Sequence, residues 1–535
     1  MIYSLKKQNK EEILKLFIKY GNIVIVFSVI GEIIFFPSWA NVAGCAMAVI
    51  SWIIFNVLFL KKRIILFHTF SFLAYLSMFL ACYIPLPATL IEAKPISYGF
   101  QNPLETFFYQ TLIFIVASLA FFAVIYKKAR RNNYLQKTLY RLNFFNTNPT
   151  VLWVLGIIGL FSRIQTLAVV NEVQIGDVGS KFLDGFVYLQ YAPLILLFPT
   201  LSGVSNSNKG NKSIFVYVIF LVVLSFATNS RQQMIYPLLT ILLLFSIYLL
   251  KDNISVFSLF SPSKIVFALF FVFFGLGFLS DISLAMLENR ILRKDNIDRM
   301  ELLTKTFETL QQDDVMESLR AKSLENQSSV VTYETTWDEN YLNNFMLNRY
   351  GNLRVVDETI YYANKIGFAN SKMQETFLTK TFAIYPLPIL TALGIDVDKT
   401  NLDFSPGDML YFIGTGNPNA LGGHRVTSLI GDGLATFGYW CFPIVFVLLF
   451  FSFKLMDSFI YFTKTDIVFS TLGLINIFGF FGIFRNSIGC IVPLEYLLRG
   501  FFQQCFTFWL LVFIIGRIFG LKKNYKKISL QAINF

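Results

Sequence analysis

Apolar segments of about 20 residues recur along almost the whole chain, and they constrain its fold more than any other feature. A helix that crosses a bilayer needs about 20 mainly apolar residues, because backbone groups in lipid must find their hydrogen-bond partners within the segment. With 55% hydrophobic and 15% charged residues, the composition excludes a soluble domain. The sequence therefore predicts an all-α polytopic membrane protein with about twelve transmembrane helices, near residues 14–36, 39–60, 64–85, 106–126, 150–171, 183–202, 213–229, 232–250, 265–284, 434–455, 466–488 and 500–520.

Lysines and arginines gather in every second connection between these segments. Lys61-Lys62-Arg63, the run between 127 and 141, and the tail from Lys522 to Lys527 would share one side of the membrane, whereas the short connections on the other side carry few cations. Since cytoplasmic loops are enriched in Lys and Arg, both termini are predicted to be cytoplasmic. The net charge of +12 is spread over these connections, so nucleic acid is not expected as a partner.

One long polar stretch, residues 285–433, interrupts the apolar segments. The alternation of basic connections places it outside the cytoplasm. It divides the chain into a bundle of about nine helices over 1–284, the loop itself, and about three helices with a basic tail over 434–535. Within the loop, residues 285–325 and 337–366 have the spacing of amphipathic helices, and prolines and glycines predict turns from 385 onward.

The sequence contains no recognisable motif for a nucleotide or a metal ion. Gly414–Gly423 is rich in glycine, but it neither ends in Lys-Ser/Thr nor follows a strand, so it is not a P-loop. The two histidines and five cysteines do not have the spacing of metal ligands. We therefore expect no cofactor and no metal site.

Arginines stand at the predicted outward ends of several apolar segments. Arg163 lies inside one, Arg231 lies in a tight turn, and Arg485 follows the end of another. At the centre of a membrane an arginine costs roughly 2.5–3.5 kcal/mol, and each could also be an interfacial anchor whose side chain reaches water. Guanidinium groups bind phosphate with two hydrogen bonds. Together with the cations of the loop they predict a surface that binds a lipid-linked pyrophosphate, formed by Arg163, Arg231, Arg349, Arg354, Arg425 and Arg485.

Three side chains are candidates for proton transfer. His424 stands beside Arg425 where the loop returns to the membrane, and histidine can accept a proton near neutral pH; alternatively, it is a polar loop end packed on the bundle. Asp357 and Asp432 are the competing carboxylates. Asp357 also lies three residues after Arg354, so both could belong to an exposed, ion-paired helix.

The overall layout resembles the oligosaccharide repeat-unit polymerases of bacterial surface polysaccharides, the Wzy-type O-antigen and capsule polymerases. The likeness covers nearly the whole chain: about twelve spans, Asn229-Ser230-Arg231 between two of them, and a large late loop. The exit of that loop, Thr427-Ser428-Leu429-Ile430-Gly431-Asp432-Gly433-Leu434-Ala435-Thr436-Phe437-Gly438-Tyr439-Trp440, is similar to the family's entry into the following span. The segment Arg349…Arg354…Asp357 is similar to one found in some members.

This resemblance implies a metal-independent membrane glycosyltransferase of the GT-C type, located in the bacterial inner membrane. It would transfer a growing glycan from undecaprenyl pyrophosphate to a lipid-linked repeat unit in lipopolysaccharide or capsule biosynthesis. A chain-length regulator protein would be a further partner. The outward arginines would hold pyrophosphate, and His424, Asp357 or Asp432 would accept the proton of the sugar hydroxyl.

Two other functions fit much of the same pattern. An O-antigen ligase would transfer the finished glycan, and a flippase or transporter of lipid-linked oligosaccharides would need a polar path through the bilayer. The large polar loop and the segment from Arg349 to Asp357 favour the polymerase over the ligase. The charges gather at one face of the membrane and Arg163 is almost the only interior cation, which disfavours a flippase or transporter.

Overall fold

The computed structural model describes most of the predicted bundle and much of the polar loop. The described residues are 12–126, 132–145, 148–168, 183, 185–202, 211–227, 231–259, 261, 263, 281–282, 284–286, 288–289, 299–328, 332–334, 336–395, 397–399, 402–463, 466–485 and 488–520. They are almost entirely helical, and the described sheet has two strands.

Five helical segments of the described residues are long and apolar enough to cross a membrane, or six if a bent pair counts as one span. The bent pair is α4 (Thr69–Tyr83) and α5 (Pro85–Ile91), which meet at 45°, where Pro85 has no N–H to continue the helix. The five segments confirm a helical membrane protein, and the count of twelve stays a prediction. They are α1 (Glu12–Phe35), α2 (Trp39–Ile54) with η1 (Phe55–Phe59), α6 (Pro103–Ile125), Leu429–Phe459, and Ile491–Ile518.

The middle of the bundle consists of shorter or irregular helices. The predicted span over 183–202 is mostly the 3-10 helix η2 (Val187–Leu197), which contains Pro193, a residue that cannot donate a helical hydrogen bond. Most of the predicted span over 265–284 lies outside the described residues. The other elements here are α3 (Lys62–Phe67), α7 (Tyr134–Arg141), α8 (Pro149–Ala168), η3 (Pro199–Ser202), α10 (Asn211–Ala227), α11 (Arg231–Asp252) and α12 (Val256–Leu259).

The prediction of one straight helix over 466–488 is wrong. Residues of this segment form strand β2 (Ile467–Phe469), which pairs antiparallel with β1 (Ile460–Phe462). Two short helices follow, and Ser470 caps the first of them by accepting from Gly473 N–H at 3.0 Å. Asn132 holds the hairpin, because its side chain exchanges two hydrogen bonds with the backbone of Phe462. The short helices are α23 (Thr471–Ile475) and α24 (Ile477–Gly482), followed by α25 (Ile491–Glu495), η9 (Tyr496–Gly500) and α26 (Phe501–Ile518).

The predicted polar loop is folded into helices over most of its described residues. The helix expected over 337–366 is divided at Asn352, whose side chain accepts from the N–H groups of Arg354 and Val355 and so begins a new helix. The loop and the segment after it contain α14 (Arg299–Gln311), α15 (Asp313–Ser328), α16 (Phe345–Gly351), α17 (Arg354–Ile366), α18 (Ser371–Ala383), α19 (Leu387–Ala392), α20 (Pro406–Thr415), η6 (Pro418–Ala420), α21 (Leu429–Phe437), η7 (Gly438–Trp440), α22 (Cys441–Met456) and η8 (Asp457–Phe459).

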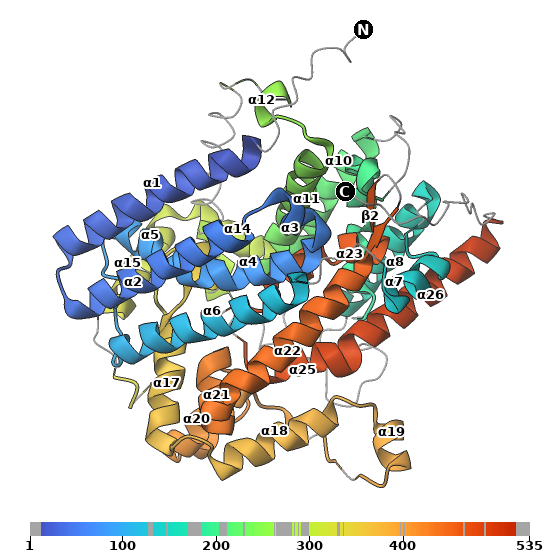
Figure 1. Ribbon diagram of the computed structural model, residues 1–535. Coiled ribbons are helices and arrows are strands. Elements are labelled where there is room, and N and C mark those ends of the chain that lie inside the picture. The colour runs from blue at the N-terminus through green and yellow to red at the C-terminus, as the bar shows by residue number, and fades with distance from the viewer. Residues whose placement is uncertain are drawn as a thin grey trace.

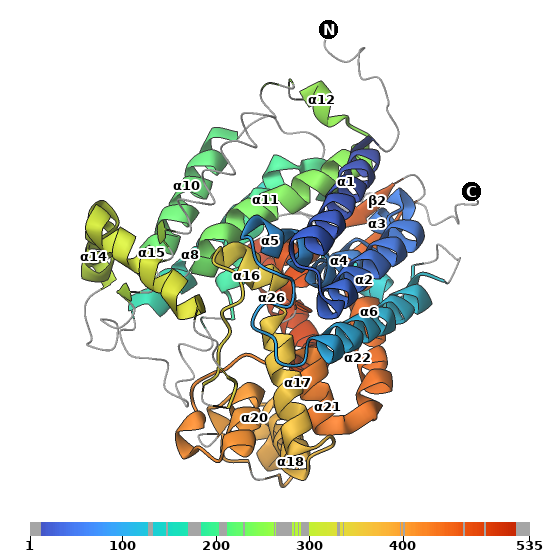
Figure 2. The ribbon, with the colours of Figure 1, turned by 90° about the vertical axis from the view of Figure 1, so that its left-hand side faces the viewer.

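The helices from α17 to α21 gather at one end of the molecule. Figures 1 and 2 show α17, α18, α20 and α21 at the bottom, whereas α12 and β2 lie toward the opposite end. Helix α17 connects this end to the bundle, since it packs against α6, α20 and α21. Its contact with α21 is close: a Cβ on Gly431 would come within 2.3 Å of Thr359 Oγ1. The connections predicted to be cytoplasmic and the predicted outward loop therefore lie at different ends, and the orientation in the membrane stays a prediction.

Candidate functional site

Asp357 joins the loop to the start of α6. Its carboxylate is fully buried and accepts four hydrogen bonds, from Gln101 N–H at 2.7 Å, Asn102 N–H at 3.0 Å, Thr106 Oγ1 at 2.8 Å and Tyr333 OH at 2.7 Å. Burial raises the pKa of Asp357, and these donors partly offset that rise. Both oxygens are occupied, so the geometry gives Asp357 a structural role at this junction.

Replacing Asp357 by alanine should strongly destabilise the protein. Four donors would lose their acceptor, and the donors of Thr106 and Tyr333 are buried. Each unsatisfied buried group costs about 1–3 kcal/mol. We expect a clear loss of folded protein, measured as the melting temperature of the purified protein in detergent. The matched control is Asp403→Ala, because the Asp403 side chain is 62% exposed. Equal melting temperatures for the two variants would contradict the structural role.

Arg354 is also held inside the loop. It is 3% exposed, its Nη2 lies 2.8 Å from Asp338 Oδ2, and its Nη1 donates to the carbonyl of Asn340 at 2.7 Å. The expectation of an exposed helix with Arg354 paired to Asp357 is therefore wrong. The reason is that Arg354 is the first residue of α17, where its side chain meets the preceding loop instead of the next helical turn.

Arg425 and His424 both donate hydrogen bonds to Asp408. The buried Asp408 carboxylate accepts the backbone N–H of His424 at 2.8 Å and of Arg425 at 3.1 Å, and Arg425 Nη1 at 3.0 Å. The hydrogen bonds from Ser405, His424 and Arg425 outweigh burial and lower the pKa of Asp408. The His424 imidazole points elsewhere: it is 63% exposed, and its Nε2 lies 3.9 Å from Asp403. His424 thus shapes the loop through its backbone, in a left-handed conformation with φ +53°.

Asp432, Arg163 and Arg231 belong to three different helices, α21, α8 and α11. Asp432 is buried, and its Oδ2 accepts the N–H of Cys490 at 2.7 Å, which connects α21 to the segment before α25. Arg163 is buried in the bundle, where Nη1 donates to Gln190 Oε1 at 2.9 Å. Arg231 begins α11, and its side chain lies outside the described residues.

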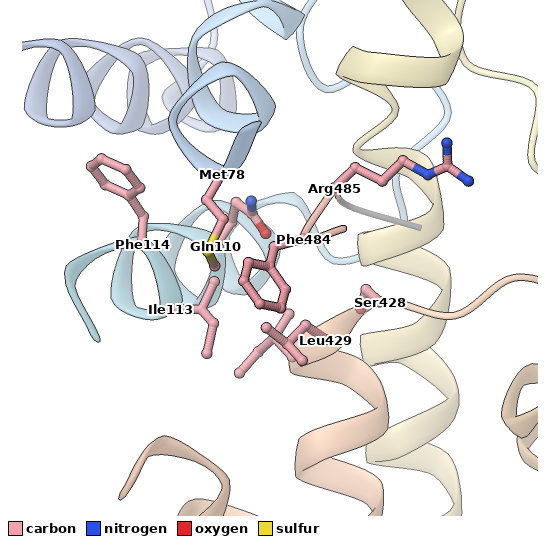
Figure 3. A pocket seen from close by; sticks show the side chains of 9 residues that line it. Met78, Gln110, Ile113, Phe114, Ser428, Leu429, Phe484 and Arg485 are labelled. Atoms are coloured by element: carbon pink, nitrogen blue, oxygen red, sulfur yellow. The ribbon is translucent and has the colours of Figure 1, made fainter. Parts of the chain in front are cut away.

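A pocket opens where the loop meets the bundle. Its walls come from α4, α6, the start of α21 and the turn after α24. The walls are mostly apolar, and Arg485 is the charged residue among them (Figure 3). Figure 3 shows the Arg485 side chain extending away from Met78 and Phe114. The lining residues are Met78, Gln110, Ile113, Phe114, Ser428, Leu429, Ile430, Phe484 and Arg485.

Arg349 and Arg485 are two predicted site residues whose charges interact. Arg349 belongs to α16, which packs over the outward-predicted ends of α4 and α5, and its charge acts directly on Arg485. Tyr350 beside it contacts Phe481 of α24, with ring centroids 5.9 Å apart. The buried Nε of Arg485 has no hydrogen-bond partner among the described residues. Like charges repel each other, so the arrangement favours an anion that neutralises both.

Glu339 is a carboxylate on which the charges of Arg349 and Arg425 act. Its sequence pattern did not mark it as a site residue. Its Oε1 accepts from Trp337 Nε1 at 2.9 Å and from Val426 N–H at 3.1 Å, and no described residue donates to Oε2. Burial raises the pKa of Glu339, although these two donors and the charges of Arg349 and Arg425 lower it. A half-buried carboxylate with a raised pKa and a free oxygen is suited to accept a proton. The sequence feature that could have pointed to Glu339 is the polar run Asp338-Glu339-Asn340, which directly follows Trp337.

Among the described residues, no three His, Cys, Asp or Glu side chains lie close enough to share a metal ion. The chain matches no protein-family model, no curated protein and no solved structure. The function is therefore argued from the site itself.

Proposed function

We propose that the chain is a membrane glycosyltransferase that polymerises lipid-linked oligosaccharide repeat units at the outer face of the bacterial inner membrane. The observation that carries the proposal is Arg485 in the lining of a largely apolar pocket between helices of the bundle, with a buried Nε that has no partner among the described residues and with the charge of Arg349 acting on it. A ligand that fits this pocket would combine a multiply charged anionic group with an apolar chain. A polyprenyl pyrophosphate has both, and this supports the substrate class implied by the family resemblance.

The charges and hydrogen bonds of this region suit a glycosyl transfer. The hydroxyl oxygen of the acceptor sugar would form a bond to the anomeric carbon of the donor glycan, and the bond from that carbon to the pyrophosphate oxygen would break. The electron pair would leave on the pyrophosphate, where Arg349 and Arg485 would stabilise the developing charge. The hydroxyl proton would pass to Oε2 of Glu339.

The other predicted residues support this site indirectly. Asp408 fixes the backbone of His424 and Arg425, and this places Val426 N–H against Glu339. Asp357 fixes α17 to α6. We therefore propose Glu339 as the base, Arg349 and Arg485 as the pyrophosphate ligands, and Asp357, Asp432 and His424 as residues that shape the fold.

Deleting the gene in its bacterial host tests the proposal. If the chain is the polymerase, the surface glycan on a gel should collapse from a ladder to single repeat units that are still attached to the lipid A core. Loss of a ligase or of a flippase would leave no attached repeat units, so that result would contradict the proposed function. A ladder unchanged from wild type would exclude all three.

A further inference from the structure

The segment between α18 and α20 carries apolar side chains that nothing in the described chain covers. No charged residue occurs between Lys380 and Asp396. Leu387, Ile389 and Leu393 are 53%, 47% and 65% exposed. We name residues 384–395 the apolar arm. Isolated exposed leucines are ordinary on a protein surface, but three on one short helix and its end form a patch of the kind that marks an interaction surface.

Several backbone groups of the apolar arm find their hydrogen-bond partners within the arm. Pro386 and Pro388 stand at the start of α19 and have no N–H groups to leave unpaired there. At the other end, Ile395 N–H donates to the carbonyl of Leu390 at 2.9 Å, and Thr391 Oγ1 donates to the carbonyl of Leu387 at 3.0 Å. A backbone that enters lipid must pair its polar groups within the protein, whereas a backbone exposed to water can hydrogen-bond to the solvent.

Two lysines fix the base of the arm. Lys399 Nζ donates to the carbonyls of Ala383 and Tyr385, at 2.8 and 2.5 Å. Lys380 Nζ donates to the carbonyls of Leu402 and Phe404, at 3.1 and 2.5 Å. These charged hydrogen bonds close the arm at its ends, so its apolar tip is held in place relative to α18.

The arm begins where the lipid-facing surface of the last candidate span begins. Arg499, in η9 just before α26, donates its Nη1 hydrogen to the carbonyl of Ile384 at 3.1 Å. Only 22% of the apolar window in Ile491–Ile518 is buried in the protein, and Phe502 and Phe506 are 59% and 61% exposed. Figure 1 shows α19 apart from α17, α20 and α21. The exposed apolar surface of the span thus continues into the arm.

We propose that the apolar arm inserts into the membrane interface beside α26, with Leu387, Ile389 and Leu393 among the lipid acyl chains. Its occupant is the bilayer, because a surface continuous with a lipid-facing helix meets lipid first. Interfacial helices typically bury their apolar face about 5–10 Å into the boundary between headgroups and acyl chains. The arm would hold the loop against the membrane whatever reaction the chain performs.

The test uses the full-length chain in vesicles of phosphatidylethanolamine and phosphatidylglycerol. An environment-sensitive fluorophore is attached at Leu393→Cys, and separately at Leu387→Cys, in a Cys505→Ser background, because the other four native cysteines are buried. The vesicles contain lipids with a nitroxide quencher high on the acyl chain. The control is Leu421→Cys, which is 39% exposed and follows η6 on another part of the loop.

We expect blue-shifted emission and several-fold stronger quenching at positions 393 and 387 than at 421. Quenching no stronger than at position 421 would overturn the proposal. A blue shift that is not accompanied by quenching, and that increases with the number of protein molecules per vesicle, would also overturn the proposal. A second copy of the chain would then cover the arm. A blue shift without quenching that does not depend on that number would assign the arm to a protein surface, and would also overturn it.

Discussion

Arg485→Ala should lower the rate of glycan polymerisation about 10²–10³-fold, the effect typical of removing one preorganised donor to a developing negative charge. Arg485 belongs to the lining of the apolar pocket, and its side chain extends away from the apolar wall (Figure 3). The charge of Arg349 acts on this side chain, beside which the leaving pyrophosphate would lie. The buried Nε of Arg485 has no partner among the described residues, so a ligand oxygen can take that hydrogen bond. The measurement is the length and amount of glycan that the purified protein makes from lipid-linked repeat units.

Lysine variants distinguish the effect of the positive charge from that of the planar guanidinium group with its paired donors. Arg485→Lys and Arg349→Lys keep a positive charge but lose the paired donors that match a phosphate, so both should remain well below wild type. The matched control is Arg320→Ala, which removes an exposed ion pair with Asp281 at 2.8 Å; such pairs contribute about 0–1 kcal/mol. If both lysine variants polymerise at the wild-type rate while present in the membrane, the pyrophosphate assignment is wrong.

The long helices could be predicted from the sequence because their signal is local. A run of apolar residues that crosses lipid must be helical whatever lies around it in the fold. Helices α1, α2 and α6 agree with the spans predicted on this basis. The same rule failed over 466–488, where the apolar run is just as clear. There the structure depends on Asn132, which lies 330 residues from Phe462 in the chain and pairs with its backbone. No local pattern contains that information.

The site shows the same limit. Arg349 and Arg485 were both predicted to bind an anion, but they are far apart in the sequence, and their charges interact because α16 packs over the ends of α4 and α5. Arg354 and Asp357 are close in sequence, yet their partners are Asp338 and the start of α6. Spacing on a helix predicts which side chains can meet, whereas tertiary contacts decide which of them do.

Glu339→Gln should be the most damaging single change in the proposed site, with a rate about 10²–10⁴-fold below wild type, as for the loss of a positioned base. The substitution should leave the fold intact. The amide oxygen of glutamine can still accept from Val426 N–H and Trp337 Nε1, the two donors that now reach Oε1. Only the negative charge and the basic oxygen are lost. The control is Glu334→Gln in the same segment, where the carboxylate is exposed and its Oε1 lies 3.5 Å from Tyr361 OH.

The pH profile distinguishes a base from a merely structural glutamate. Burial raises the pKa of Glu339 above the ordinary value for a glutamate, and only the ionised form can accept a proton. The wild-type rate should therefore fall as the pH decreases through that raised pKa, at a pH where an exposed glutamate would still be charged. Glu339→Asp should keep a pH-dependent rate, and the residual rate of Glu339→Gln should be flat over the same range. A glutamine variant that is slow but retains the wild-type pH profile would show that another group accepts the proton, with Glu339 serving only to hold Val426 in place.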